Sequence, residues 1–369
     1  MGRLKKFISS ETVLVIAFLA AVISMIFVPP SSGYADYIDF PVIIMLFCLM
    51  GVVAAFRGAG VFSAVTAVLL KRTSSARVIG FIMMNLCFFS SMLVTNDVAL
   101  ITFVPLTVGI AANTKDKSFL IRTVVIETAA ANLGSMMTPI GNPQNLFLYE
   151  HFNLTSWDFI GTMLPPGLFS YLILCLSILL IKKDRITYEK SEAAKPSPLK
   201  ITVYSVLFAV CIVAVAGLIS KYICLAVVAV GLLIFDRSAF RKIDYSLLAT
   251  FVCFFVFVGN MGAIDSVSAF ISSVMDGREL LVAALLSQII SNLPAAVMLS
   301  GFTSNAHALL AGVNIGGMGT PVASLASLIS LRCYGAAENA DKKKYMGFLL
   351  VYNFAFLALL LLFETFVLL

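Results

Sequence analysis

Long apolar runs separated by short polar segments constrain this chain more than any other feature. A helix that crosses a lipid bilayer needs about 20 mainly apolar residues. Runs close to that length occupy residues 12–28, 40–56, 118–149, 160–181, 201–218, 221–235, 245–262, 306–333 and 345–367. Only 12% of the residues are charged and 60% are hydrophobic, whereas about a quarter of a soluble domain is charged. The sequence therefore predicts an all-α integral membrane protein with about nine full crossings.

Two further apolar stretches, 78–112 and 279–305, are each interrupted near the middle by polar residues. The interruptions read TND at 95–97 and SNLP at 291–294. Each stretch is too long for one crossing and too polar at its centre for an ordinary helix, so we expect a re-entrant hairpin that enters and leaves on the same side. An amphipathic helix along the membrane surface is expected just before each hairpin, at 61–70 and 264–276.

The distribution of positive charge supports this arrangement, because Lys and Arg collect in cytoplasmic loops. With a cytoplasmic N-terminus and two hairpins that do not change sides, 23 of the 25 Lys and Arg residues lie on the cytoplasmic side, and the exceptions are Lys221 and Arg278. Residues 13–28 are then a retained first crossing, although they follow basic residues as a signal peptide would. We expect a multi-pass protein of a bacterial-type inner membrane, with an external C-terminus and no nucleic-acid partner.

The chain also contains an internal repeat. NLGSMMTPIGNPQNLFLY at 132–149 aligns without gaps with NIGGMGTPVASLASLISL at 314–331, and a hairpin interruption precedes each segment. Because the first hairpin would enter from the cytoplasm and the second from outside, the repeats are inverted. We therefore expect a single transporter domain, 1–369, made of a first half at 1–181, a cytoplasmic linker at 182–200 and an inverted second half at 201–369.

Inverted repeats with paired broken helices are the architecture of secondary transporters, whose substrates bind near the membrane midplane. Within hydrocarbon an unsatisfied backbone group costs several kcal/mol, so a broken helix must line a protected cavity. A break presents carbonyl groups at one helix end, which suit a cation, and amide groups at the next helix start, which suit an anion. Pro139 and Pro321 help to keep the two helices interrupted, and Gly141 permits a backbone turn.

On these motifs the chain resembles the ion transporter superfamily, which contains divalent anion:sodium symporters, citrate transporters, the arsenite pump membrane subunit and NhaD-type antiporters. The resemblance runs from about residue 10 to residue 367 and rests on the two hairpin tips and the two Thr-Pro breaks. It implies a homodimer in which part of each subunit slides across the bilayer against a scaffold, in an elevator motion. It also implies Na⁺ or H⁺ as the coupling ion, with no other cofactor.

The resemblance implies roles for particular residues as well. In the symporters both tips read Ser-Asn-Thr, which matches Asn96 and Asn292 to positions that contact substrate or cation. The implied substrate-binding residues are Thr95, Asn96, Asp97, Thr138, Pro139, Asn142, Ser291, Asn292, Thr320 and Pro321. The implied Na⁺ sites consist of Ser91, Asn96 and Gly141 in the first half, and of Ser287, Asn292 and Thr320 in the second.

Two departures from the symporter pattern bear on the substrate. The third tip positions hold Asp97 and Leu293 instead of Thr, and a carboxylate there would repel a dicarboxylate unless it is protonated or bound to a cation. The ND pair followed by Pro105 resembles the arsenite pump. In contrast, TPIGNPQN at 138–145 resembles small bacterial permeases of the superfamily that are labelled as anion or citrate transporters.

Two carboxylates lie at membrane depth, Asp97 and Glu127, and such residues are rare and usually functional. We expect Asp97 to take part in substrate or cation binding; the alternative is a cap on the backbone amides that begin the returning helix. Glu127 is a candidate for proton coupling, with a structural ion pair to Arg122 or a dimer contact equally open. Asn132 and Asn314 hold matched repeat positions, where hydrogen bonds between helices are favoured over substrate contact.

The sequence therefore favours an ion-coupled secondary transporter of a small anion, such as a di- or tricarboxylate or an oxyanion. Two alternatives stay open: a proton-coupled exporter of arsenite or a similar metalloid, and a Na⁺/H⁺ antiporter that uses Asp97 and Glu127. A channel or a membrane enzyme is disfavoured, because the sequence suggests no nucleophile–base arrangement and no metal-binding cluster. The seven cysteines lie in or at the ends of apolar runs without CxxC spacing, which indicates packing.

Overall fold

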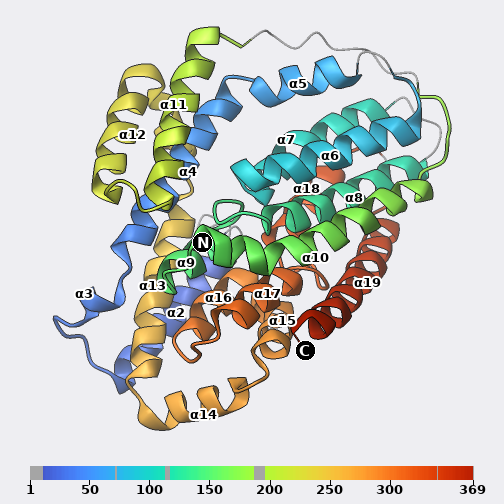
Figure 1. Ribbon diagram of the computed structural model, residues 1–369. Helices are drawn as coiled ribbons and strands as arrows, with labels where there is room; N and C mark the ends of the chain where they lie inside the picture. The colour runs from blue at the N-terminus through green and yellow to red at the C-terminus, as the bar shows by residue number, and fades with distance from the viewer. Residues whose placement is uncertain (1–10, 71–72, 113–116, 187–195, 339, 369) are drawn as a thin grey trace, which may run out of the picture.

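The computed structural model describes residues 11–70, 73–112, 117–186, 196–338 and 340–368 (Figure 1). Within these ranges the chain is helical and contains no strand. The first half holds α2 (Thr12–Phe27), α3 (Tyr34–Tyr37), α4 (Phe40–Gly58), α5 (Val61–Leu70), α6 (Ala76–Val94), α7 (Asn96–Ala111), α8 (Lys117–Ser135), α9 (Pro143–His151), α10 (Ser156–Ser177) and η1 (Ile178–Leu180). The second holds α11 (Pro198–Val215), α12 (Lys221–Phe235), η2 (Arg237–Lys242), α13 (Tyr245–Gly262), α14 (Asp265–Met275), α15 (Glu279–Ile290), α16 (Asn292–Ser300), α17 (Ala306–Gly316), α18 (Leu325–Tyr334) and α19 (Lys342–Leu368).

These helices confirm the predicted fold class. Six of the described helices are long and apolar enough to cross a membrane: α4, α6, α10 continued by η1, α11, α13 and α19. Five of these six are expected crossings, and α6 is the first arm of the hairpin expected at 78–112. The other expected crossings are α2 and α12, with 16 and 15 residues, and two helices that are divided into halves, α8–α9 and α17–α18. The hairpins are α6–α7 and α15–α16, and the short helices expected before them are α5 and α14.

Each hairpin turns at a single residue whose backbone conformation is rare for an L-residue. Thr95 has a φ of 72° and Ser291 a φ of 78°. Non-glycine residues avoid this region, and outliers of this kind gather at functional sites. One helix ends immediately before each of these residues and the next begins immediately after it. The turn therefore places the two tip asparagines inside the protein, where Asn96 is 6% exposed and Asn292 is 7% exposed.

The helices form two groups. We call α2, α4, α11, α12 and α13, which pack on one another, the scaffold group. The two hairpins, the two divided helices, α10 and α19 form the hairpin group. Helices α5 and α14 run between the groups at opposite ends of the molecule (Figure 1). Within the scaffold group α2 packs on α13 and α12 packs on α4. Each of these pairs joins a helix of the first half to a helix of the second half, as an inverted repeat predicts.

Glycines bring each hairpin against the divided helix of its own half. A Cβ on Gly134 of α8 would lie 2.1 Å from the backbone oxygen of Phe88 in α6, and a Cβ on Gly316 of α17 would lie 2.8 Å from the Cα of Ala284 in α15. Membrane helices gain no hydrophobic energy by associating in lipid, so they depend on such close packing at small residues. The two contacts occupy equivalent repeat positions and fix both hairpins in the same way.

Candidate functional site

The two divided helices are joined by paired hydrogen bonds at the centre of the hairpin group. Asn132 in α8 accepts a hydrogen bond at Oδ1 from the hydroxyl of Ser324, the N-cap of α18, over 2.9 Å. Asn314 in α17 accepts one at Oδ1 from Nδ2 of Asn142, the N-cap of α9, over 3.1 Å. The repeat aligns 132 with 314 and 142 with 324, so each bond is the counterpart of the other. Both asparagines therefore hold helices together.

Four helix N-termini meet around this crossing. Asn96 begins α7, and its Nδ2 donates to Oδ1 of Asn132 over 2.9 Å, the same oxygen that the N-cap of α18 bonds. Helix α9 begins directly after Asn142, and α16 begins at Asn292, whose backbone nitrogen donates to the oxygen of Ala323 over 2.9 Å. Each N-terminus carries a partial charge of about +0.5. Their convergence favours an anion or a carboxylate at this place.

A cavity of about 480 Å³ reaches the crossing. It is lined by the first turn of each of the four helices, through Asp97 of α7, Pro143 of α9, Leu293 of α16 and Leu325 of α18. Helices α2, α4 and α13 of the scaffold group form its other side. The cavity therefore lies between the two groups of helices, with the four N-termini on one wall.

Asp97 places an unpartnered carboxyl oxygen at this wall. Its backbone nitrogen donates to Oδ1 of Asn96 over 2.9 Å, while its own side-chain Oδ1 is buried without a hydrogen-bond partner among the described residues. A helix cap would accept a hydrogen bond from a backbone amide, and this oxygen accepts none from the described part of the chain. Because a buried acceptor without a partner is costly, this atom is available to a proton, a cation or a donor group of a substrate.

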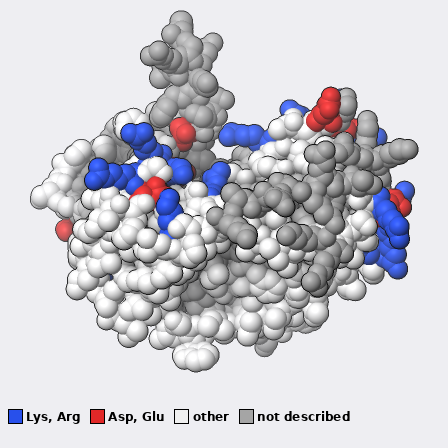
Figure 2. Space-filling view, turned by 90° about the horizontal axis from the view of Figure 1, so that it is seen from above, with Lys and Arg blue, Asp and Glu red and all other residues white. Residues whose placement is uncertain are grey.

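Charged side chains line the cavity where it approaches the surface. They are Glu11, Arg57, Lys242, Asp244 and Arg332. Salt bridges occur elsewhere in the described residues, and none involves these five. Figure 2, which looks onto the molecule from above, shows more Lys and Arg than Asp and Glu on that face. Three unpaired cations against two carboxylates give the entrance a net positive charge, which concentrates anions near it.

The two hairpin tips differ in how they meet the breaks. At the second tip, the backbone nitrogen of Asn292 and the hydroxyl of Ser291 both donate to the oxygen of Ala323, over 2.9 and 3.3 Å. In the repeat, Ala323 corresponds to Gly141. No described hydrogen bond joins Asn96 to Gly141. The cavity instead borders both the first tip and the first break. The second tip is therefore closed onto its break, and the first tip is open to the cavity.

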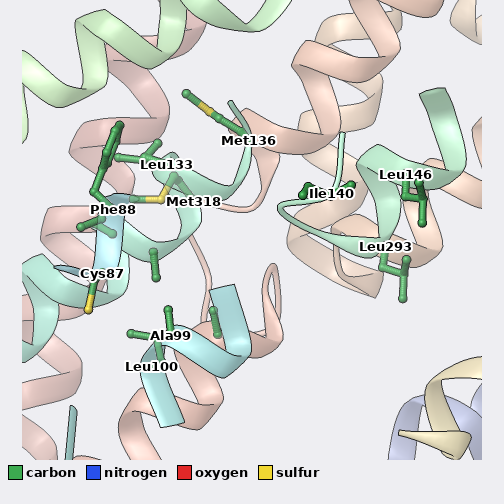
Figure 3. Packing of buried hydrophobic residues seen from close by; sticks show 14 of the residues in the cluster. Cys87, Phe88, Ala99, Leu100, Leu133, Met136, Ile140, Leu146, Leu293 and Met318 are labelled. Carbon is green, nitrogen blue, oxygen red and sulfur yellow. The ribbon is translucent and has the colours of Figure 1, made fainter. Parts of the chain in front are cut away.

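Apolar side chains complete the wall beside the tips. Ile140 and Leu293 both line the cavity, and Figure 3 shows them near each other, close to Leu146. On the other side of the same view, Met318 of the second break lies beside Phe88 (Figure 3). The tip position that carries a carboxylate in the first half thus carries an apolar side chain in the second, and both face one cavity.

Threonines of the two breaks hold the hairpins in place. Thr138 donates through Oγ1 to the backbone oxygen of Met92, and Thr320 donates through Oγ1 to that of Gln288 over 2.8 Å. Both acceptors lie three residues before the strained tip residue. The Thr-Pro motifs therefore attach each break to the hairpin of its own half, and the matched bonds follow the repeat.

The serines implied as Na⁺ ligands lie beside the breaks. Ser91 and Ser287 are fully buried, and each hydroxyl donates to a carbonyl group of its own helix, over 2.9 and 2.7 Å. A Cβ on Gly134 would lie 2.6 Å from the Ser91 hydroxyl, and one on Gly316 would lie 2.8 Å from the Ser287 hydroxyl. Each serine thus faces a divided helix across a glycine, and its role as a ligand stays a prediction.

Glu127 is absent from the cavity lining. It is fully buried in α8, where Oε1 accepts a hydrogen bond from Thr107 and Oε2 has no partner among the described residues. Arg122 instead donates to the backbone oxygen of Leu180, so an ion pair with Glu127 is not formed. Complete burial within the subunit also leaves Glu127 no surface for a dimer contact. Proton coupling at Glu127 stays a prediction.

The structure thus brings most of the sequence-predicted residues to one place. Thr95, Asp97 and Asn142 line the cavity, while the other implied binding residues lie at the tips or in the breaks: Asn96, Thr138, Pro139, Gly141, Ser291, Asn292, Thr320 and Pro321. Sequence reasoning missed Ser324, Asn145 and Gln288, whose side chains bond the two breaks. The repeat alignment, which pairs 324 with 142, could have identified Ser324.

Comparisons with known proteins agree with this architecture. The profile described as citrate transporter matches residues 5–314. The uncharacterized transporter MJ0456 of Methanocaldococcus jannaschii is 35% identical over 302 residues, which cover 80% of this chain and 81% of the relative. The inner membrane protein YbiR of Escherichia coli is 31% identical over 313 residues and 83% of each chain. The silicon efflux transporter LSI3 of Oryza sativa is 30% identical over 172 residues, or 43% of this chain and 34% of the relative.

Among solved structures, the YdaH transporter of Alcanivorax borkumensis, described as having an unusual topology, superposes with a TM-score of 0.58. The match covers 91% of this chain and 86% of that chain at 14% sequence identity, so it supports the fold alone. The family model spans most of the chain, and two relatives that match over about 80% of their own length exceed 30% identity. The chain therefore belongs to the citrate transporter family and is a multi-pass secondary transporter.

Proposed function

We propose that this transporter carries a small anion, either a carboxylate or an oxyanion, across a bacterial-type inner membrane in exchange or co-transport with H⁺ or Na⁺. The observation that carries the proposal is the convergence of four helix N-termini on one cavity wall. Half-helix N-termini point at the anionic groups of substrates in other transporters with inverted repeats. The unpaired cations Arg57, Lys242 and Arg332 near the entrance add to the attraction.

Asp97 is the proposed coupling group. It stands among positive helix ends, yet one of its carboxyl oxygens has no partner. An ionised Asp97 would repel an anionic substrate, whereas a protonated or cation-bound Asp97 would not. Binding of the coupling ion at Asp97 and binding of the substrate beside it therefore favour each other, which is what co-transport requires.

An elevator motion is the proposed route between the two sides. The hairpin group would slide against the scaffold group, and α5 and α14 connect the two. The first hairpin is predicted to enter from the cytoplasm and the second from outside. A first tip that is open and a second tip that is closed are therefore what the state open to the cytoplasm needs. At the opposite end Lys221 of α12 forms an ion pair with Glu150 of α9, which joins the two groups in this state. We propose a homodimer with a cytoplasmic N-terminus and an external C-terminus.

A second candidate is the export of a neutral metalloid acid in exchange for protons. The observation that favours it is the unpartnered oxygen of Asp97, since a neutral substrate suffers no repulsion from a carboxylate. The name of the rice relative, a silicon efflux transporter, is consistent with this candidate. Export would then use the same cavity and the same coupling group with a different substrate.

Uptake into proteoliposomes tests the proposal. Labelled citrate, succinate, arsenate and arsenite are offered to the purified protein with a pH gradient, with a Na⁺ gradient and with neither. We expect gradient-driven uptake of one of the three anions, and its loss in Asn96→Ala and Asn292→Ala. Asn85→Ala, outside the cavity lining, is the matched control and should retain uptake. Movement of arsenite alone would support the second candidate, and uptake that needs no ion gradient and survives both tip substitutions would contradict coupled transport.

A further inference from the structure

A side-chain amide donates hydrogen bonds to the backbone carbonyl groups of the first break. Nδ2 of Asn145, a fully buried residue in α9, donates to three backbone oxygens. These belong to Ser135, Met136 and Thr138, at 3.3, 3.4 and 3.1 Å. Oδ1 of the same side chain accepts a hydrogen bond from Nδ2 of Asn314 over 2.6 Å. The amide is therefore fixed at both ends, with its NH₂ group surrounded by the oxygens that unwinding releases.

A second amide bonds two carbonyl groups at the second break and one of its own helix. Nε2 of Gln288 in α15 donates to the backbone oxygens of Ala284, Gly316 and Met318, at 3.0, 2.8 and 3.0 Å. Its Oε1 accepts a hydrogen bond from the backbone nitrogen of Thr320 over 2.9 Å. This amide is again held through both its oxygen and its nitrogen.

The two amides share one matching carbonyl group, although they stand at positions that do not match in the repeat. Met136 and Met318 correspond to each other, and each gives its oxygen to an amide. Asn145, however, follows its break along the chain, and Gln288 precedes its own. Two unrelated positions thus each provide an amide to the same repeat position, that of Met136 and Met318. We infer that the carbonyl groups of the breaks require a donor, because a backbone oxygen within a membrane cannot be left without a partner.

In transporters with broken helices, unwound carbonyl groups of this kind coordinate the coupling cation. We propose that in this protein the amides of Asn145 and Gln288 stand in place of such cations, so that the carbonyl groups they bond do not take up Na⁺ and coupling runs through a proton at Asp97. An NH₂ group offers the carbonyl oxygens positive hydrogens as a cation would, but it is part of the chain and is never released. The inference rests on the proposed function, since it names the coupling ion.

The charged groups that line the cavity together with Asp97 are Glu11, Arg57, Lys242, Asp244 and Arg332. They belong to α4, η2, α18 and the segments before α2 and α13. A proton that enters by the cavity therefore reaches Asp97 without passing either amide.

The test compares the thermal unfolding midpoint of the purified protein in NaCl and in KCl at the same ionic strength of about 0.15 M. The probe is the ion alone, so no substrate is needed. We expect the same midpoint for the wild-type protein in both salts. Asn145→Asp and Gln288→Glu replace an NH₂ donor by a carboxylate oxygen beside the same carbonyl groups. Each variant should have a lower midpoint in KCl and regain several degrees in NaCl, because an ion that binds only the folded state stabilises it.

Asn85→Asp is the matched control, because the Nδ2 of Asn85 bonds only a carbonyl group of its own helix, that of Phe81. It should show no difference between the two salts. A rise of the wild-type midpoint in NaCl would overturn the inference, and so would folded variants without any response to Na⁺. If the variants do not fold, the wild-type comparison decides, together with uptake under a pH gradient in the absence of Na⁺. Failure of every substrate in the uptake assay would count against the proposed function and leave the ion comparison intact.

Discussion

Removal of the Asn314 side chain tests the crossing of the two divided helices. Asn314→Ala deletes a hydrogen bond from Asn142 at 3.1 Å, one to Asn145 at 2.6 Å and one to the oxygen of Leu310 at 2.9 Å. Hydrogen bonds between membrane helices average about 0.6 kcal/mol, and a buried group left unpaired costs about 1–3 kcal/mol in soluble proteins. Asn142 keeps a second partner, Ser135, at 3.3 Å. We therefore expect a loss of about 1–4 kcal/mol.

A double-mutant cycle isolates the bond between the halves. The variants Asn314→Ala and Asn142→Ala, separately and together, are unfolded in detergent and compared with the wild-type protein. Residues in direct contact show coupling energies of about 0.5–3 kcal/mol, whereas distant pairs add within about 0.3–0.5 kcal/mol. The cap that Asn142 forms on the nitrogen of Asn145 affects the single variant and cancels in the cycle. Asn314 paired with Asn305, the N-cap of α17, is the additive control. Additive behaviour of Asn142 and Asn314 would refute the crossing.

Gly134→Ala places a Cβ 2.1 Å from a backbone oxygen of α6, so the thermal midpoint should fall by several degrees, whereas Gly109→Ala, with nothing within 4 Å, should not lower it. Lys221→Met removes the ion pair with Glu150 that joins α12 to α9, and single-molecule fluorescence transfer between the groups should report a smaller share of the state seen here. Glu127→Gln keeps an acceptor for the hydroxyl bonded to Oε1, so folding should be preserved; a loss of gradient-driven uptake alone would assign Glu127 to proton coupling.

The fold could be predicted from sequence because the membrane leaves few choices. An apolar run of sufficient length must be a helix, and a polar interruption must be protected. The hairpin expected at 78–112 is observed as Ala76–Val94 and Asn96–Ala111, since the polar residues of its tip mark the only place where the chain can turn. The distribution of positive charges predicts that the hairpins do not cross the membrane. Short elements such as α3 carry no apolar signal and were not expected.

The site was predicted in part. Thr138 and Thr320 were recognisable because each precedes a proline in a repeated motif. The importance of Asn145 and Gln288 depends on which carbonyl groups they reach, and those contacts form only when distant segments of the chain pack together. The difference between the open and the closed tip is a property of one conformation. A repeat that makes the two tips similar in sequence cannot reveal it.

The role of Asp97 is tested most directly by separating substrate exchange from accumulation in Asp97→Asn. The amide keeps the shape of the side chain and cannot take part in proton binding. We predict that Asp97→Asn still exchanges internal for external substrate across proteoliposomes and no longer accumulates it in response to a pH gradient. Asp158→Asn, at the exposed N-terminus of α10, is the matched control and should accumulate substrate as the wild-type protein does. Accumulation by Asp97→Asn at the wild-type level would contradict a coupling site at the first hairpin tip.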